Sequence, residues 1–357
     1  MNLLSALFIS LFSLLQSNSE VDLMFVGDAM QHSGQYNAAH RADGTYDYSQ
    51  YFTHIESDIR WADISVVNLE CSLGGAPYSG YPCFSAPDSY AEQLKKSGFN
   101  FFLTANNHCL DRRDSGARRT IAVLDSLGVP HIGTYVNAAA RSRQLPMIQT
   151  VKGVKIGFLC YTYGTNGIPV KEDVVVDYID RDIIARDIKA ARQAGAQVLC
   201  VAMHWGDEYH LQPVESQKTM ADWLVEQGVD LIIGGHPHVV EPMEVRHSKA
   251  YDKDVLLVYS LGNFISDMKD IDCRGGAMLK VSVSMIGDKP HIIDPRYKLF
   301  FVQKPGGNGS THTIIPEDRP ELLRADSREA FNRFMQRTHD LVTSHNINVR
   351  DEVTHKN

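Results

Sequence analysis

The chain has 357 residues, of which 43% are hydrophobic and 22% are charged, and its formal net charge is −8. This composition is typical of a soluble globular protein, and the length suits one large α/β domain or two smaller ones. Nucleic-acid binding is excluded, because phosphate backbones require clustered Lys and Arg and the sequence has no such run.

The N-terminal residues 3–15 form the apolar stretch LLSALFISLFSLL. It has the length of a signal-peptide core and is shorter than the about 20 residues that a membrane-spanning helix needs. Ser17 and Ser19 are small residues at the two positions that a signal peptidase reads. We therefore predict a signal peptide over residues 1–19 and export to the periplasm or cell surface, peripheral to the membrane. Because no Lys or Arg precedes the stretch, a buried first helix or an uncleaved anchor is the alternative.

Downstream of Glu20, short β-branched or aromatic runs alternate with longer mixed segments, which is typical of an α/β fold. Most of the early runs are apolar throughout, as expected for strands buried on both faces. The predicted strands are 22–28, 63–70, 100–108, 155–163, 197–206, 230–238, 255–264 and 277–285. The predicted helices are 89–96, 114–127, 181–194, 215–227 and a surface helix within 317–345.

Side chains capable of binding metal or of acid–base chemistry stand at the ends of these strands. In open α/β sheets, sites form outside the carboxyl ends of the strands, so we expect these side chains to meet. Two carboxylates, an amide oxygen and three imidazoles form a ligand set suited to one or two ions of Mn, Fe or Zn. For each motif alone, a turn or a buried polar group is the favoured explanation, and only the set as a whole indicates a metal site. The residues are Asp28, Asn68, Glu70, Asn106, Asn107, His108, His204, His236, His238 and Asn263.

The segment GGHPHVV (234–240) places two histidines one residue apart. On an extended segment the side chains of His236 and His238 point to the same side, so both can face one metal site. Pro237 lacks an amide hydrogen and stiffens the loop, and the two glycines before it allow a tight exit from the strand. The alternative interpretation is a packed strand end without a metal.

Six ordered motifs connect these residues to a known family. They are GD-x-M (27–30), NLE (68–70), ANNH with a following Asp (105–111), HWG-x-EY (204–209), GGHPHVVEPME (234–244) and YSLGNF (259–264). From about residue 21 to about residue 302, the chain resembles the CapA/PgsA-type capsule synthesis proteins, which are similar to calcineurin-like metallophosphoesterases. The resemblance implies an α/β fold of the four-layer αββα sandwich type and a cell-envelope location. It also implies a link to poly-γ-glutamate or another capsular polymer.

The same resemblance implies a role for each candidate residue. Asp28 corresponds to the aspartate of the first motif, and Glu70 corresponds to the carboxylate that bridges two metal ions. The other implied metal ligands are Asn107, His204, His236 and His238. His108 is implied to protonate or stabilise the leaving oxygen.

Three positions depart from the metallophosphoesterase pattern. Met30 stands where these enzymes carry a metal-binding histidine, and a thioether cannot replace imidazole for these metals. We therefore expect one complete metal position and one weaker one. Asn68 and Glu70 replace the usual Gly-Asp pair, which leaves open which of them reaches the metals. Asp111 is shifted along the chain relative to the aspartate that usually follows the Asn-His pair.

Several further residues are candidates for supporting roles. We expect Asn68, Asn106, Glu208, Tyr209 and Asn263 to orient ligands or contact substrate. For Glu208, Tyr209 and Asn263, loop capping is an equal alternative. Cys71 and Cys83 flank a Gly- and Pro-rich loop and could form a disulfide after export, although spacing alone does not fix the geometry.

The predicted organisation is a signal peptide (1–19), a CapA-like domain (20–305), and a C-terminal loop, surface helix and tail (306–357). The predicted function is metal-dependent hydrolysis of a phosphoester or a polymer amide bond during capsule production. The expected partners are an anionic or capsular polymer and membrane-bound synthase or export components. The alternative is a non-catalytic binding or assembly module with a degraded metal site. Met30 favours that module, and His108 favours the enzyme.

Overall fold

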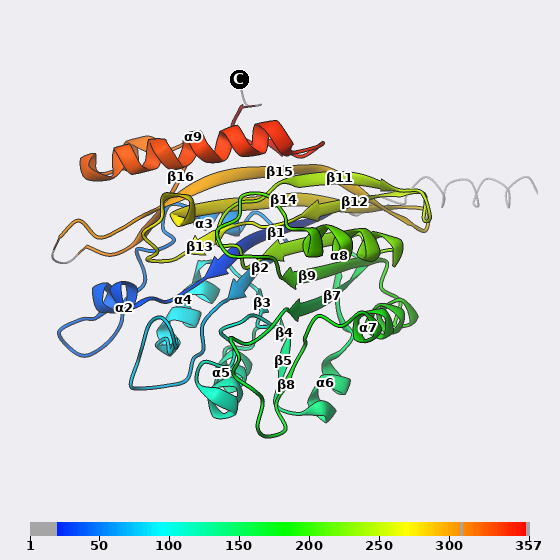
Figure 1. Cartoon of the computed structure of the whole chain (residues 1–357), viewed down its shortest axis with the longest axis horizontal. Helices are drawn as coiled ribbons and strands as arrows, with labels where there is room; N and C mark the ends of the chain where they lie inside the picture. Colours follow the sequence, from blue (N-terminus) through cyan, green and yellow to red (C-terminus); the bar gives the residue numbers. More distant parts are fainter. Residues whose placement is uncertain (1–19, 308–309, 355–357) are drawn as a thin grey trace, which may run out of the picture.

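The computed structural model describes residues 20–307 and 310–354, which form two β-sheets packed face to face with helices on their outer faces (Figure 1). The predicted signal peptide, residues 1–19, lies outside the described residues. Within the described ranges, no helix is both long and apolar enough to cross a membrane.

The larger sheet has nine strands, and β1 lies near its middle. β1 pairs in parallel with β2 and antiparallel with β14, and the runs that form β1 and β2 are almost wholly buried. The strand order is β16 (Thr313–Pro316), β15 (Lys289–Gln303), β14 (Gly275–Ile286), β1 (Glu20–Ala29), β2 (Ile64–Leu69), β3 (Phe101–Leu103) and β4 (His131–Ile132). β13 (Asn263–Ile265) also pairs with β1, and β17 (Arg350–Asp351) pairs with β15.

The second sheet has six strands, with four parallel strands between two antiparallel edge strands. The order is β11 (Met243–Ser248), β12 (Lys253–Val258), β10 (Leu231–Gly235), β9 (Val198–His204), β7 (Val154–Thr162) and β6 (Met147–Val151). A separate pair joins β5 (Thr134–Tyr135) to β8 (Val175–Val176).

The main hydrophobic core lies between the two sheets. It joins Phe25 and Phe101 of the larger sheet to Phe158 and Leu231 of the second sheet, all of them buried. The rings of Phe101 and Phe158 are 4.4 Å apart between centroids. Full burial of each such side chain contributes about 1.5–3 kcal/mol to the free energy of unfolding, so this contact holds the sheets together.

Helices cover the outer face of each sheet, which confirms the predicted four-layer αββα fold. α4 and α5 contribute to the apolar cluster outside the larger sheet, and α7 and α8 contribute to the cluster outside the second sheet. The Asp180 carboxylate accepts hydrogen bonds from two backbone amides and so begins α7. The helices are α2 (Ser33–Ala39), α3 (Glu56–Ile59), α4 (Asp88–Ser97), α5 (Arg113–Leu127), α6 (Ala138–Gln144), α7 (Arg181–Gln193), α8 (Glu215–Glu226) and α9 (Arg328–His345).

The C-terminal region after residue 305 continues the larger sheet. β16 and β17 both pair with β15, and α9 lies along β15 (Figure 1). α9 buries Phe331 and Phe334 against Phe301, with ring centroids 5.8 and 6.0 Å from it. The predicted surface helix is therefore amphipathic and belongs to the core on one face.

The predicted strand 255–264 is two strands in different sheets. β12 lies in the second sheet, whereas β13 pairs with β1 in the larger sheet, so the chain crosses between the sheets around Gly262. Gly262 has φ +72, and a Cβ on Gly27 would lie 1.9 Å from the Gly262 carbonyl oxygen. Two glycines therefore allow the close approach that this crossing requires.

The open question of a disulfide is answered by the structure, because Cys71 and Cys83 are both free thiols. Cys71 packs in the apolar cluster outside the larger sheet, whereas Cys83 is exposed in the following loop.

Candidate metal centre

The carboxyl ends of strands from both sheets meet at one place. Asp28 is the last residue but one of β1, Glu70 follows β2, and His204 ends β9. His236 and His238 lie in the loop after β10, and Oδ2 of Asp28 accepts a hydrogen bond from the His236 amide at 3.1 Å. This bond links the two sheets at the site. All five side chains are buried.

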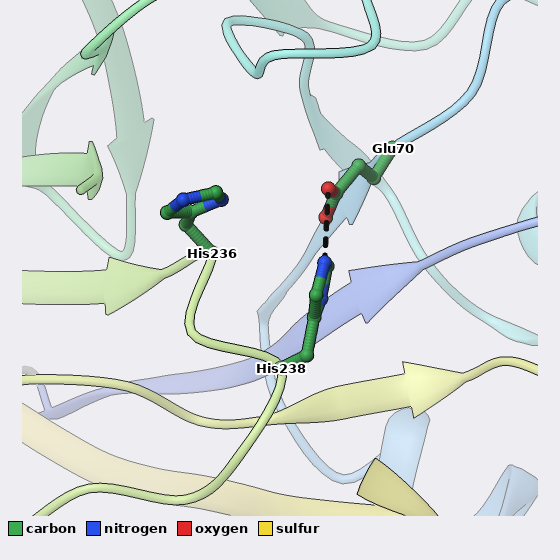
Figure 2. Close-up of side chains that lie close together, drawn as sticks. All are labelled: Glu70, His236 and His238. Carbon is green, nitrogen blue, oxygen red and sulfur yellow. Dashed lines mark ion pairs between the residues drawn. The ribbon is translucent and has the colours of Figure 1, made fainter. Parts of the chain in front are cut away.

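Glu70 is the shared member of two possible ligand sets. One set is Glu70, His236 and His238, and the other is Asp28, Glu70 and His204; in each set the ligand atoms lie within 4.8 Å of one another. Oε1 of Glu70 lies 3.6 Å from Nε2 of His204 and 3.9 Å from Nε2 of His238. Figure 2 shows the Glu70 carboxylate facing His238, with the His236 ring beside them. Glu70 would therefore contribute a ligand to a cation held by either set.

The buried donor atoms of this cluster fit a divalent cation. Oε1 of Glu70 and Nδ1 of His236 have no hydrogen-bond partner, although a buried polar atom normally has one. Burial raises the pKa of Glu70 well above its ordinary value, and the neighbouring Asp28 raises it further. A cation between these groups would satisfy the free atoms and offset the repulsion between the carboxylates.

Two of the histidines, His204 and His236, are held in the neutral form that binds metals. Burial lowers the pKa of His236 to about 3. Burial likewise lowers the pKa of His204 well below its ordinary value. Burial also acts to raise the pKa of Asp28, but the hydrogen bond from His238 and the nearby imidazoles outweigh it and lower that pKa. Neutral imidazoles beside an ionised carboxylate are the protonation states that a transition metal requires.

Asn68 lies between the two carboxylates as a hydrogen-bond donor. Its Nδ2 donates to Oδ1 of Asp28 at 2.8 Å and to Oε2 of Glu70 at 3.4 Å. Its Oδ1 accepts from Asn106 at 3.1 Å. The structure therefore brings Glu70 toward the histidines and gives Asn68 a positioning role.

The Asn106-Asn107 pair has two different environments. Oδ1 of Asn107 lies 2.8 Å from Nε2 of His204, which places it with the candidate ligands. Asn106 instead donates to the backbone oxygen of Leu69 at 2.9 Å and accepts from the His108 amide at 3.2 Å. Asn106 thus fixes the loop that carries Asn107 and His108.

His108 and Asp111 form a buried pair next to the ligands. Nδ1 of His108 lies 2.8 Å from Oδ2 of Asp111, and the Phe84 amide donates to the same oxygen at 2.7 Å. The Phe84 ring packs edge-on to His108 at 4.6 Å between centroids. The shifted position of Asp111 in the sequence therefore still brings its carboxylate to the histidine.

The other predicted supporting residues separate into two groups. Asn263 contacts a candidate ligand, because its Oδ1 lies 3.1 Å from Nδ1 of His238 and its Nδ2 donates to the Cys273 carbonyl at 2.9 Å. Glu208 and Tyr209 are exposed at the rim, and the Tyr209 ring lies 6.3 Å from the His238 ring.

Two residues near the site escaped the sequence interpretation. Oδ1 of Asn166 accepts from Asn107 at 3.1 Å, and Nδ2 of Asn166 lies 3.5 Å from Nδ1 of His108. The ring of His32 lies 5.2 Å from that of Phe84, and burial lowers the pKa of His32 to about 4. The only available signal was weak: an Asn-Gly turn at 166–167 and a histidine two residues beyond GD-x-M.

The expected extended geometry of the His-Pro-His segment is wrong. β10 ends at Gly235, and His236 and His238 have φ values of +100° and +61°. This backbone region is unfavourable for residues with a Cβ and is found where the surrounding structure enforces it, often at functional sites. The two rings meet because the chain bends sharply after β10.

Met30 is a buried core residue. Its side chain is buried in the apolar cluster outside the larger sheet, together with Tyr48 and Tyr90. The position that the metallophosphoesterase pattern fills with a histidine is therefore occupied by a core residue.

The family follows from a comparison with known proteins. Residues 22–268 match the family model described as bacterial capsule synthesis protein PGA_cap. The chain belongs to this family. That assignment confirms the resemblance carried by the six motifs.

The chain is 26% identical over 263 residues to capsule biosynthesis protein CapA of Bacillus anthracis, covering 71% of this chain and 61% of that protein. It is 29% identical over 196 residues to PGA biosynthesis protein CapA of Bacillus subtilis, covering 54% of this chain and 50% of that protein. It thus spans half to about three-fifths of these relatives.

Solved structures show more distant similarity. Sulfate thiohydrolase SoxB of Thermus thermophilus is 15% identical with a TM-score of 0.41, covering 77% of this chain and 43% of that one. A 5'-nucleotidase of Candida albicans is 11% identical with a TM-score of 0.40, covering 72% of this chain and 47% of that one.

Proposed function

We propose that the chain is a metal-dependent hydrolase that cleaves a phosphoester or amide bond during the production of a capsular polymer. The observation that carries this proposal is the pair of ligand sets sharing Glu70, with two buried donor atoms that lack hydrogen-bond partners. Burying an ionised carboxylate without a hydrogen-bond partner destabilises the folded protein unless a cation balances its charge.

Different residues of the chain would have different roles in the hydrolysis. A divalent ion held by Asp28, Glu70, Asn107 and the three ligand histidines would supply Lewis-acid polarisation and lower the pKa of water. Asp111 binds Nδ1 of His108 and so leaves Nε2 as the atom that would donate a proton to the leaving group. Asn68 and Asn263 hold ligand side chains in place through hydrogen bonds.

The biological setting is part of the same proposal. Family membership and similarity to two proteins named for capsule and PGA biosynthesis support a role with poly-γ-glutamate or a related polymer and its synthesis machinery. Export through the N-terminal segment would place the chain at the cell envelope, where such a polymer is made.

Metal reconstitution tests the proposal directly. The metal-free protein is loaded with Mn²⁺ or Zn²⁺, bound metal is measured, and hydrolysis of bis(4-nitrophenyl) phosphate and of poly-γ-glutamate is followed. We expect bound metal and turnover in the wild type. We expect His236→Ala to lose bound metal while keeping its fold, and His291→Ala, an exposed histidine on β15, to retain both.

The competing candidate is a non-catalytic module that holds the polymer. The burial of Met30 in the core, where a ligand histidine is absent, is the observation in its favour. The buried His108–Asp111 pair argues for the enzyme, because a binding module has no use for an oriented acid beside the metal. Metal binding without turnover on either substrate would favour the module.

A further inference from the structure

Asn166 is an exposed residue whose side chain reaches two buried residues of the candidate centre. Its Oδ1 accepts a hydrogen bond from Nδ2 of Asn107 at 3.1 Å, and its Nδ2 lies 3.5 Å from Nδ1 of His108. Asn166 lies in the loop after β7 of the second sheet, whereas Asn107 and His108 lie in the loop after β3 of the larger sheet. The contact therefore joins loops of the two sheets beside the candidate metal ligands.

The turn at 165–168 fixes the backbone of Asn166. The Ile168 amide donates to the Thr165 carbonyl at 2.8 Å, and the Thr165 hydroxyl donates to the Ile168 carbonyl at 2.7 Å. The two residues between them, Asn166 and Gly167, have φ values of +51° and +71°. Asn-Gly is the pair most favoured in a turn whose two central residues both have positive φ. The local sequence therefore holds Asn166 at the place from which its side chain reaches Asn107.

The carboxamide of Asn107 has two ends of nearly equal shape. Only its oxygen can bind a metal ion, because its NH2 group is a hydrogen-bond donor. The torsion that rotates the group has a broad, roughly two-fold profile, so the side chain by itself selects neither end. Neighbouring hydrogen bonds must therefore decide whether Oδ1 or Nδ2 of Asn107 faces the candidate ligands.

Two contacts of Asn107 favour the observed orientation, and metal binding affects them differently. Nε2 of His204 lies 2.8 Å from Oδ1 of Asn107. When both of these atoms bind a cation, the proton between them is lost, and the contact is no longer a hydrogen bond. The bond from Nδ2 of Asn107 to Oδ1 of Asn166 involves no candidate ligand atom. It can therefore orient Asn107 in the metal-loaded protein as well.

We propose that Asn166 is a positioning residue that keeps the oxygen of the Asn107 carboxamide, rather than its nitrogen, directed at the metal. Oδ1 of Asn166 is an acceptor, so it attracts the Nδ2 end of Asn107 and repels the Oδ1 end. Loss of a partner that orients a ligand in this way lowers metal affinity by about 10–100-fold. This inference rests on the proposed function, because it requires the metal centre named there.

Titration of the metal-free chain with Mn²⁺ alone, and separately with Zn²⁺, tests the role of Asn166 without turnover. Asn166→Gly removes the carboxamide and suits the positive φ of the turn, so the fold should be kept. The substitution should raise the Kd for the metal by about 10–100-fold. Asn348→Gly is the matched control, since Asn348 is also exposed with φ +56° but lies between α9 and β17. It should bind metal as the wild type does.

A variant of Asn107 separates orientation from a general loss of structure. Asn107→Asp gives the side chain two equivalent oxygens, so neither end is unable to bind the metal. In that background Asn166→Gly should raise the Kd by less than about threefold, and the double-mutant cycle measures the difference. An equal Kd for Asn166→Gly and the wild type overturns the proposal. An equally large effect of Asn166→Gly in both backgrounds overturns it too.

The outcome for Asn166 is separate from the outcome for hydrolysis. If the wild type binds metal but hydrolyses no substrate, the hydrolase proposal fails, and the changes in Kd still decide the role of Asn166. A wild type that binds neither Mn²⁺ nor Zn²⁺ overturns both proposals.

Discussion

The carboxylate of Asp111 lies 2.8 Å from Nδ1 of His108, and both side chains are buried beside the candidate metal ligands. The pair joins two residues of a single turn, and the Phe84 amide holds the same carboxylate oxygen from the neighbouring loop. Asp111 is therefore fixed from two sides, and so is the orientation of the His108 ring.

The first prediction separates the acid from the residue that positions it. His108→Ala should lower kcat by about 10²–10⁴-fold, because it removes the leaving-group acid. Asp111→Asn should lower kcat by about 10–100-fold, because the ring loses its orienting carboxylate. Bound metal should be unchanged in both variants.

A substrate with a better leaving group checks this assignment. Its hydrolysis needs less help from an acid, so the defect of His108→Ala should shrink as the leaving-group pKa falls. A defect of the same size on every substrate, or a loss of metal, would contradict the acid role of His108.

The second prediction concerns the buried charge of Glu70. In the metal-free protein, Glu70→Gln should raise the free energy of unfolding by about 1–2 kcal/mol, because it removes a buried carboxylate next to Asp28. The wild type should gain about 2.7 kcal/mol when free metal exceeds its Kd 100-fold. Glu70→Gln should lose most of this gain. Denaturant unfolding with and without metal measures all four states.

Glu226→Gln provides the charge control for that experiment. Glu226 is exposed at the end of α8, so its substitution should leave both the metal-free stability and the metal response unchanged. If no divalent metal changes the free energy of unfolding of the wild-type protein, the ligand sets around Glu70 are excluded.

The third prediction asks whether position 30 can be restored as a ligand. Met30→His should lower the free energy of unfolding by about 1–3 kcal/mol, because it buries an imidazole in an apolar cluster. It should not increase the bound metal. Met30→Leu, which keeps the core apolar, should cost less than about 1.5 kcal/mol. A gain of one metal ion per chain in Met30→His would show instead that this side chain can reach the site.

The fourth prediction concerns the attachment of α9. Nε2 of His339 lies 2.9 Å from Oε2 of Glu317, and Nδ1 lies 3.7 Å from Oδ2 of Asp351. The hydrogen bond to Glu317 raises the pKa of His339 above its ordinary value, burial acts against this, and the charges of Asp351 and Asp340 add to it. Burial also raises the pKa of Glu317. These contacts tie α9 to β16 and β17.

Both shifts give the same sign of pH dependence. His339 contributes fully to the free energy of unfolding below its unfolded pKa, and this contribution is lost as pH rises through its higher folded pKa. The raised pKa of Glu317 also lowers the free energy of unfolding at higher pH, because the folded state holds the Glu317 proton more tightly than the unfolded state does. The free energy of unfolding should therefore fall from pH 6 to pH 9 by about 1 kcal/mol from this cluster. His339→Gln should flatten that slope, whereas His345→Gln at the end of the same helix should not.

The sequence by itself predicted the central strands of both sheets, the helices α4, α5, α7, α8 and α9 and most of the candidate ligands, but not β15 or the short edge strands. Apolar runs such as 22–28 and 197–206 are long and continuous, so burial on both faces gives them a clear signal. Asp28 and His204 stand directly at the ends of such runs, and parallel strands bring their carboxyl ends together whatever the loops do. The ordered motifs then identified the family.

Only the tertiary structure decided what the loops contribute. Asn166, His32 and Tyr163 reach the site through loops whose paths depend on turns and on contacts with distant segments, and spacing along the chain does not encode these paths. The same holds for the bend that gives His236 and His238 positive φ, for the crossing from β12 to β13 and for the burial of Met30 in the core. Strand ends are set by local hydrophobic patterns, whereas side chains on loops take their places from packing across the whole fold.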